Sequence, residues 1–234
     1  MNVLITGASR GIGKAIAQVF AEQGHQLFLS SRNADALEKT ACEIIAEYPQ
    51  ATVQFKAVDL SAKEDALALA AWMEQSGGTP DILVNNAGSF EPGSVHNEAD
   101  GALERQLSIN LLSAYHLTRA VLPTMMKNGQ GRHIFNMCSI ASLKAYENGG
   151  AYSISKFALY GFSKNLREEM KPHGIKVTAV MPGATLTDSW EGFDNSSKRI
   201  MEAKDIALMV YASSQLSIQA CVEEIVIRPQ LGDL

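Results

Sequence analysis

Two side chains that could carry proton-transfer chemistry, Tyr152 and Lys156, stand four residues apart in a stretch with a helical pattern. That spacing places both on one face of a helix. A tyrosine, with an ordinary pKa of about 10, is a poor acid or base at neutral pH. A nearby ammonium favours the phenolate, so such a tyrosine could exchange a proton with an alkoxide or alcohol. Most isolated Tyr-x-x-x-Lys pairs are structural, so a catalytic role for this pair depends on the other motifs of the chain.

A glycine-rich loop near the start of the chain predicts a phosphate site. Residues 6–13 read Thr-Gly-Ala-Ser-Arg-Gly-Ile-Gly, between a predicted strand and an amphipathic helix. Gly7 permits a tight turn, Gly11 lets the backbone approach a pyrophosphate, and Gly13 lets the helix pack on the sheet. The free N–H groups of the helix N-terminus would face the phosphates. The alternative is a turn that merely needs glycine, but the strand–loop–helix context favours the phosphate site.

The elements that must hold these residues alternate along the chain. Strands are predicted at residues 2–6, 26–31, 52–58, 81–85, 132–138, 175–181 and 223–228, and helices at 12–24, 35–48, 63–76, 102–127, 151–172 and 204–214. Such alternation predicts an α/β fold, a doubly wound Rossmann fold with about seven parallel strands and helices on both faces. No linker interrupts the pattern, so residues 1–234 are predicted to form one dinucleotide-binding and catalytic domain.

Composition argues against several classes of protein. With 25 acidic and 20 basic residues among 234, the net charge of −5 gives no sign of a nucleic-acid or anionic-membrane surface. No apolar run is long enough to span a bilayer, and no signal segment opens the chain. Three cysteines without CxxC spacing favour a reducing compartment, so we predict a cytoplasmic protein. The five histidines show no metal-ligand spacing, and no metal is expected.

Further motifs resemble the short-chain dehydrogenase/reductase family over almost the whole chain. Beside the Gly-x-x-x-Gly-x-Gly loop they are Asn85-Asn86-Ala87-Gly88, a lone Asn110, Ser139, the Tyr152–Lys156 pair, and Pro182-Gly183. The resemblance implies hydride transfer between a nicotinamide cofactor and a carbonyl or alcohol. It implies that Tyr152 is the acid or base, that Ser139 binds the substrate oxygen, that Lys156 also binds the nicotinamide ribose, and that Asn110 holds a water that relays protons.

The residue types at the end of the second predicted strand bear on the choice of cofactor. An acid there would bind the adenosine ribose hydroxyls of NAD, but the position holds Ser31, followed by Arg32. Arg10 lies in the glycine loop on the same side. Guanidinium groups hold a 2′-phosphate that a carboxylate would repel, so NADP(H) is predicted. The alternative is that both arginines are solvated surface residues.

The resemblance extends the set of cofactor contacts. Asp59 matches the position that binds the adenine amino group, with a helix N-cap as its alternative role, and Leu60 lies beside the ring. Thr187 matches a side-chain contact with the carboxamide and Thr185 a backbone contact. The full predicted set is Gly7, Ser9, Arg10, Gly11, Ile12, Gly13, Ser31, Arg32, Asp59, Leu60, Asn86, Ala87, Gly88, Tyr152, Lys156, Pro182, Gly183, Thr185 and Thr187.

The substrate pocket is expected beyond the carboxyl ends of the strands, under a short lid at about residues 188–203. Position suggests as its lining Phe90, Glu91, Ile140, Ala141, Leu143, Tyr146, Trp190 and Phe193. Well-known relatives reduce 3-oxoacyl groups on acyl carrier protein, but the short lid and the C-terminus, which lacks their glycine-rich ending, favour a small free ketone or aldehyde.

The sequence is compatible with three functions. The favoured one is an NADPH-dependent carbonyl reductase; the others are a 3-oxoacyl-(acyl-carrier-protein) reductase and a catalytically idle NADP-binding regulator. An epimerase or dehydratase of the extended branch would need a longer C-terminal domain. The resemblance also implies a homodimer or homotetramer formed through the helices near 102–127 and 151–172.

Overall fold

Seven parallel strands form the centre of the computed structural model, which describes residues 1–127, 129–187, 190, 192 and 194–232. The sheet has the order β3-β2-β1-β4-β5-β6-β9. Its strands are β1 (Asn2–Thr6), β2 (Gln26–Ser31), β3 (Thr52–Ala57), β4 (Ile82–Asn85), β5 (His133–Met137), β6 (Lys176–Pro182) and β9 (Glu224–Ile227). The α/β Rossmann-like prediction is confirmed, with strand limits that move by at most one residue at either end.

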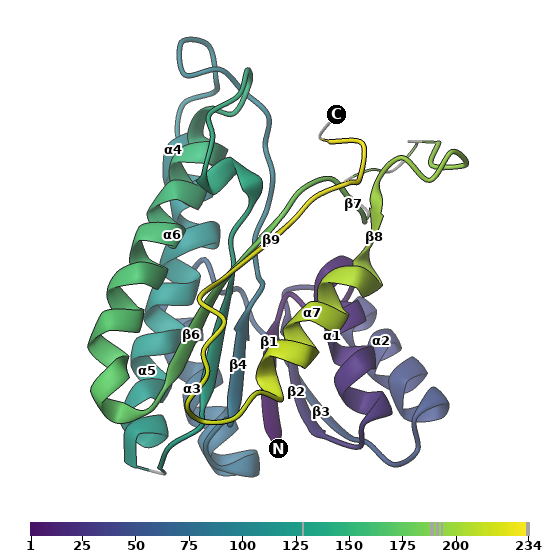
Figure 1. Ribbon diagram of the computed structural model, residues 1–234, viewed down its shortest axis with the longest axis vertical. Coiled ribbons are helices and arrows are strands. Elements are labelled where there is room, and N and C mark those ends of the chain that lie inside the picture. Colours follow the sequence, from purple (N-terminus) through teal and green to yellow (C-terminus); the bar gives the residue numbers. More distant parts are fainter. Residues whose placement is uncertain (128, 188–189, 191, 193, 233–234) are drawn as a thin grey trace.

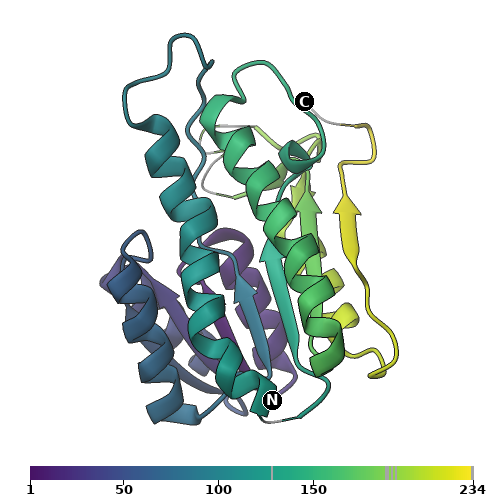
Figure 2. The ribbon, with the colours of Figure 1, turned by 90° about the vertical axis from the view of Figure 1, so that its left-hand side faces the viewer.

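Helices cover both faces of the sheet (Figure 1). One face carries α1 (Gly11–Glu22), α2 (Ala34–Glu47) and α7 (Ala203–Ser214). The other carries α3 (Lys63–Gly77), α4 (Ala102–Leu107), α5 (Ser113–Lys127) and α6 (Gly150–Met170). Figure 2 shows the long α4–α5 rod and α6 side by side on that second face. Of the described helices, none is long and apolar enough to cross a membrane.

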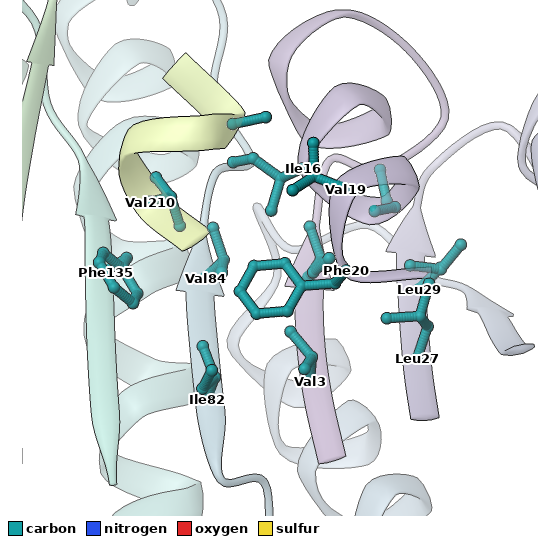
Figure 3. Packing of buried hydrophobic residues seen from close by; sticks show 14 of the residues in the cluster. Val3, Ile16, Val19, Phe20, Leu27, Leu29, Ile82, Val84, Phe135 and Val210 are labelled. Carbon is teal, nitrogen blue, oxygen red and sulfur yellow. The ribbon is translucent and has the colours of Figure 1, made fainter. Parts of the chain in front are cut away.

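Successive side chains along each central strand point to opposite faces of the sheet, and this divides the core into two layers. Val3 and Ile5 of β1 pack toward α1 and α7, whereas Leu4 between them packs toward α3 and α5. Because both faces are covered, such strands are apolar throughout rather than on one side. Phe20 of α1 is fully buried at the centre of the first layer (Figure 3), where its ring meets Tyr211 edge-on at 5.3 Å.

The structure adds short elements that the sequence pattern did not predict. The predicted helix at 102–127 is interrupted by a π-helical segment, η1 (Ser108–Leu112). A 3-10 turn, η2 (Ile140–Ser142), follows β5, and another, η3 (Lys171–His173), ends α6. Strands β7 (Thr185–Leu186) and β8 (Met201–Glu202) form a separate two-stranded sheet at the base of the predicted lid.

One buried histidine makes the stability of this fold depend on pH. His133 at the start of β5 is 2% exposed, and its Nε2 lies 2.7 Å from the Thr178 hydroxyl. Its ring stacks on Phe135 at 3.9 Å. Burial, with a smaller contribution from the charge of Lys176, lowers the pKa of His133 to about 3. The native protein therefore holds this ring neutral.

We expect this neutral ring to destabilise the fold as the solution becomes acidic. Below a pH of about 6.5 the unfolded chain gains a proton on His133 that the native state does not accept until a pH of about 3. At pH 5 this proton uptake should lower the free energy of unfolding by about 2 kcal/mol relative to pH 7.5. His133→Gln removes the titration, so urea unfolding of this variant should lose that much less stability between the two pH values. Equal losses in both proteins would contradict the assignment.

Candidate functional site

A cavity of about 1040 Å³ lies at the carboxyl edge of the sheet. Loops that follow β1, β2, β4, β5, β6 and β9 all contribute to its wall. In a parallel sheet these strand ends lie on the same edge, and helices that leave to opposite faces open a crevice between them. The sheet order puts this change of side between β1 and β4. The cavity therefore occupies the position where a doubly wound sheet binds a ligand.

The glycine loop forms one wall of the cavity and has the geometry that a phosphate group needs. Gly7 has a φ of +63°, a left-handed conformation that side chains rarely adopt. A Cβ at Gly13 would collide with the Gly7 carbonyl, and it would lie 2.5 Å from the side-chain nitrogen of Asn86. Substitution at either position would displace the loop. The N-terminus of α1, which begins at Gly11, faces the same space and offers unpaired N–H donors.

Asn86 holds this loop in place. Its Nδ2 donates hydrogen bonds to the carbonyl oxygens of Thr6 at 3.0 Å and Gly7 at 3.1 Å. The hydroxyl of Thr6 in turn accepts from the backbone N–H groups of Asn86 and Ala87, both at 2.9 Å. The motif after β4 thus ties the ends of β1 and β4 together. Asn86 also lines the cavity, but its side-chain donors are already used by the loop.

The far end of the cavity carries two arginines, Arg10 and Arg32, together with Ser31. Both arginines are exposed. Asp59 differs from its predicted role, because it is exposed and does not belong to the cavity wall, whereas Leu60 does. Its carboxylate accepts from the Ser61 N–H at 3.0 Å, and α3 is capped at Ala62 rather than at Asp59.

The electrostatic surroundings of Asp59 show that Arg32 is close to it. Burial tends to raise the pKa of Asp59, but hydrogen bonds from Ser61 and the charge of Arg32 together hold that pKa below its usual value. The end of the cavity that carries Arg10 and Arg32 is therefore flanked by the carboxylate of Asp59, which does not belong to the wall.

Ser139 and Tyr152 meet at the middle of the cavity. Ser139 caps η2, where its Oγ accepts from the Ala141 N–H at 3.1 Å. Its hydroxyl is also hydrogen-bonded to the phenol of Tyr152. The neighbouring Ser142 instead donates to the carbonyl of Lys156 at 2.9 Å and fixes η2 to α6. Ser139, which is predicted to bind the substrate oxygen, thus faces the tyrosine, whereas Ser142 holds the 3-10 turn against α6.

Burial sets the protonation of the reacting pair. It raises the pKa of Tyr152, an effect that the hydrogen bond from Ser139 only partly offsets. Lys156 is 7% exposed, and burial lowers its pKa to about 8. Its Nζ donates to the Met137 carbonyl at 2.8 Å and lies 5.8 Å from the centre of the Tyr152 ring. The net shift of the Tyr152 pKa is therefore upward, opposite to the expected one, because desolvation of the phenol dominates.

Asn110 lies behind the cavity wall rather than on it. The π-helical segment around it turns its side chain inward, leaving it 1% exposed. Its amide accepts from the Ser89 N–H at 2.9 Å and lies within hydrogen-bond distance of the Ser89 carbonyl, Gln106 and Ser155. Ser155 donates to the Tyr152 carbonyl at 2.7 Å. Asn110 thereby connects the loop after β4 to the helix that carries Tyr152.

The loop after β6 closes the opposite wall. Thr185 is buried, and its hydroxyl donates to the Gly183 carbonyl at 2.9 Å. Thr187 approaches the glycine loop so closely that a Cβ at Gly11 would lie 3.2 Å from its methyl group. The loop after β6 and the glycine loop therefore lie close together at this point of the cavity.

Most of the predicted site residues gather on this one wall. Among the catalytic set, Ser139, Tyr152 and Lys156 belong to it and Asn110 does not; among the cofactor set, only Gly13 and Asp59 are missing. Of the predicted pocket residues, Glu91 points elsewhere and forms an ion pair with Arg105 at 3.3 Å. Phe193 lies outside the described residues, as do residues 188, 189 and 191 of the predicted lid.

The wall also includes residues that the sequence pattern did not single out. They are Asn33, Ala36, Val58, Ser89, Ile109, Met137, Cys138, Lys144, Ala145, Ala184, Val226 and Arg228. The signal for Arg228 was its place at the end of the last predicted strand, and that for Lys144 its place between Ser139 and Tyr152. Within the described part of the chain, no three His, Cys, Asp or Glu side chains gather as metal ligands would.

Proteins of known structure or activity are similar to this chain over nearly its whole length. A solved alcohol dehydrogenase from Thermococcus sibiricus superposes with a TM-score of 0.91 at 26% identity, covering 100% of this chain and 98% of that one. L-sorbose reductase from Gluconobacter frateurii superposes with a TM-score of 0.87 at 27% identity, covering 97% and 95%. Sepiapterin reductase from Chlorobaculum tepidum is 33% identical over 240 residues, which cover 99% of this chain and 97% of that protein.

The sequence pattern that describes the short chain dehydrogenase family matches residues 1–198. That match spans the glycine loop, Asn110, Ser139 and the Tyr152–Lys156 pair, all of which the fold brings to or behind one cavity wall. The chain therefore belongs to the short chain dehydrogenase family of oxidoreductases.

Proposed function

We propose that this protein is an NADP(H)-dependent carbonyl reductase in which Tyr152 is the general acid. The observation that carries the proposal is the meeting of Ser139, Tyr152 and Lys156 on the wall that also holds the glycine loop. Two similar proteins support this kind of cofactor and reaction, since the alcohol dehydrogenase was solved with 5-hydroxy-NADP and the L-sorbose reductase with NADPH and L-sorbose.

The cavity fits a dinucleotide with a 2′-phosphate at the end that Arg10 and Arg32 occupy. The glycine loop leaves no space for side chains on the pyrophosphate side, as the Gly7 and Gly13 geometry requires. Ser31 takes the place of an acid that would repel a 2′-phosphate. At the other end, Pro182, Gly183, Thr185 and Thr187 would surround the nicotinamide. When bound, NADPH supplies the hydride that reduces the carbonyl carbon.

The residues of the chain handle the proton and the developing charge. Ser139 and Tyr152 both present hydroxyls to the substrate oxygen, and Tyr152 gives it a proton as the carbonyl becomes an alcohol. A raised pKa keeps the Tyr152 phenol protonated at neutral pH, which is the state that reduction needs. The ammonium of Lys156 then stabilises the phenolate that is left behind. Asn110 acts as a positioning residue by holding Ser89 and Ser155; a water relay through it stays a prediction.

We also propose a homo-oligomer formed through the α4–α5 rod and α6. Ile154 and Phe157 on α6 leave 44% of their surfaces exposed, and Leu112 beside them leaves 40%. A Cβ at Gly161 would meet nothing within 4 Å, so one side of α6 is open along two turns. Such an apolar strip on adjacent helices suits a second copy of the same surface.

The central test is turnover of carbonyl compounds. Purified protein should oxidise NADPH in the presence of some ketones, aldehydes or 3-oxoacyl thioesters, followed by the loss of nicotinamide absorbance. Tyr152→Phe removes the proton donor and should lower kcat by about 100-fold or more, with NADPH affinity preserved in calorimetry. Tight NADPH binding without turnover of any compound, unchanged by Tyr152→Phe, would instead favour a regulatory protein. Tyr160→Phe, outside the cavity on the same helix, is the matched control.

The cofactor assignment predicts an effect of Arg32 on one dinucleotide only. Arg32→Ala removes a charge-assisted hydrogen bond to the 2′-phosphate and should weaken NADPH binding by roughly 10- to 100-fold, with little change for NADH. Dissociation constants for both dinucleotides can be measured by nucleotide fluorescence. Lys39→Ala, an exposed lysine of α2 outside the cavity wall, controls for net charge. Equal losses for NADPH and NADH would contradict the assignment.

The lowered pKa of Lys156 predicts how reduction depends on pH. Below about pH 8 Lys156 is charged and Tyr152 is protonated, so kcat/KM should be level; above about pH 8 Lys156 loses its proton and kcat/KM should fall. Lys156→Arg keeps the charge at all accessible pH values, so the profile should stay level to a higher pH even if the plateau is lower. A fall at the same pH in both proteins would assign it to another group.

A further inference from the structure

The half of the cavity beyond Tyr152 has an apolar floor that is only partly covered. Phe90, Leu143 and Tyr146 line it with 47%, 45% and 46% of their surfaces exposed. Phe90 stands edge-on to the Tyr152 ring at 4.9 Å, so this apolar surface begins at the proposed proton donor. Large apolar side chains that stay exposed around a catalytic group form a surface for the body of a substrate.

The charges on the wall of the whole cavity are of one sign. Its described lining residues include five cations and no carboxylate, although acidic residues outnumber basic ones 25 to 20 in the chain. Three of these cations have roles in the proposed function, namely Arg10 and Arg32 toward a 2′-phosphate and Lys156 beside Tyr152. Lys144 and Arg228 are the two that this function does not use.

The strand order separates these two cations from the phosphate end. Arg32 follows β2, on one side of the glycine loop, whereas Lys144 follows η2 after β5 and Arg228 follows β9. The Gly183 N–H donates to the Ile227 carbonyl at 2.8 Å, which fixes the chain just before Arg228 against the loop that closes the cavity. Lys144 directly follows Leu143 of the apolar floor. Both cations therefore lie on the opposite side of the glycine loop from Arg32, and Lys144 continues the apolar floor.

Two acids of the neighbouring segments are engaged elsewhere. Glu91, which sequence position suggested for the pocket, pairs with Arg105. Glu98 accepts from the Ala151 N–H at 3.1 Å and so caps the N-terminus of α6. Among the described residues no carboxylate lies within ion-pair distance of the Lys144 ammonium, which is exposed. Its charge is thus available to a ligand in the cavity.

We propose that the substrate is an oxo acid, with an apolar or aromatic body on Phe90, Leu143 and Tyr146 and a carboxylate bound by Lys144. This proposal rests on the reductase function and adds the class of substrate to it. The reaction remains a two-electron reduction: NADPH gives hydride to the carbonyl carbon, Tyr152 gives a proton to its oxygen, and the carboxylate is unchanged. Because the carboxylate binds away from the reacting carbon, Lys144 should act on KM rather than on kcat.

The test compares aryl oxo acids with their methyl esters, which have nearly the same shape without the charge. The acids form a series with different numbers of carbons between the carbonyl and the carboxylate, so the measurement finds the spacing that lets the carboxylate reach Lys144. Wild type should prefer the best acid over its ester by roughly 10-fold in kcat/KM. Lys144→Gln should lose this preference through a higher KM for the acid, with kcat and the ester reaction unchanged. Lys144→Arg should retain it, and Lys204→Gln, an exposed lysine outside the cavity, should behave as wild type.

A binding measurement decides the proposal independently of turnover. Calorimetry on the complex with NADP⁺ should detect the corresponding hydroxy acid more tightly than its ester in wild type, and equally in Lys144→Gln. Equal kcat/KM and equal binding of acids and esters in wild type would overturn the oxo-acid proposal while leaving the reductase function intact. Selective binding of acids without turnover of any carbonyl compound would support the anion site and contradict the reductase function instead.

Discussion

The parallel direction of all seven main strands is the constraint on which the rest of this molecule depends. Because every strand runs the same way, the loops that follow β1, β2, β4, β5, β6 and β9 open at one edge. Helices that cover both faces make the strands apolar on both sides and leave that edge as the place where polar side chains can gather. Motifs that are more than a hundred residues apart in the chain thereby share one cavity.

Hydrogen bonds within the protein fix the shape of the cavity before any ligand is considered. Asn86 and Thr6 bind the glycine loop to the end of β4, and Ser142 binds η2 to α6. Asn110 connects the loop after β4 to the helix of Tyr152 through Ser155. Side chains whose hydrogen-bonding groups are already paired have little freedom to move, so Ser139 and Tyr152 are presented in a defined relation.

Burial has opposite effects on the two titrating groups of the site, since it disfavours the charged form of each. It raises the pKa of Tyr152 and lowers that of Lys156 to about 8. At neutral pH the tyrosine is thus a neutral proton donor beside a lysine that is still mostly charged. This combination suits the proposed reduction, in which the phenol would first hold the proton and the ammonium would then stabilise the phenolate.

The sequence by itself determined the order of the elements and the motifs, because strand and helix periods and glycine spacing are local properties. Seven strands and the glycine loop could be predicted from it, and the family resemblance implied the grouping of Ser139 with Tyr152 and Lys156. Only the tertiary structure decided which neighbours each side chain meets: Asp59 turns to Ser61, Glu91 pairs with Arg105, and a π-helical segment turns Asn110 inward. The direction of the Tyr152 pKa shift and the presence of Lys144 and Arg228 on the cavity wall were decided there too, because desolvation and wall charge depend on segments far apart in the chain.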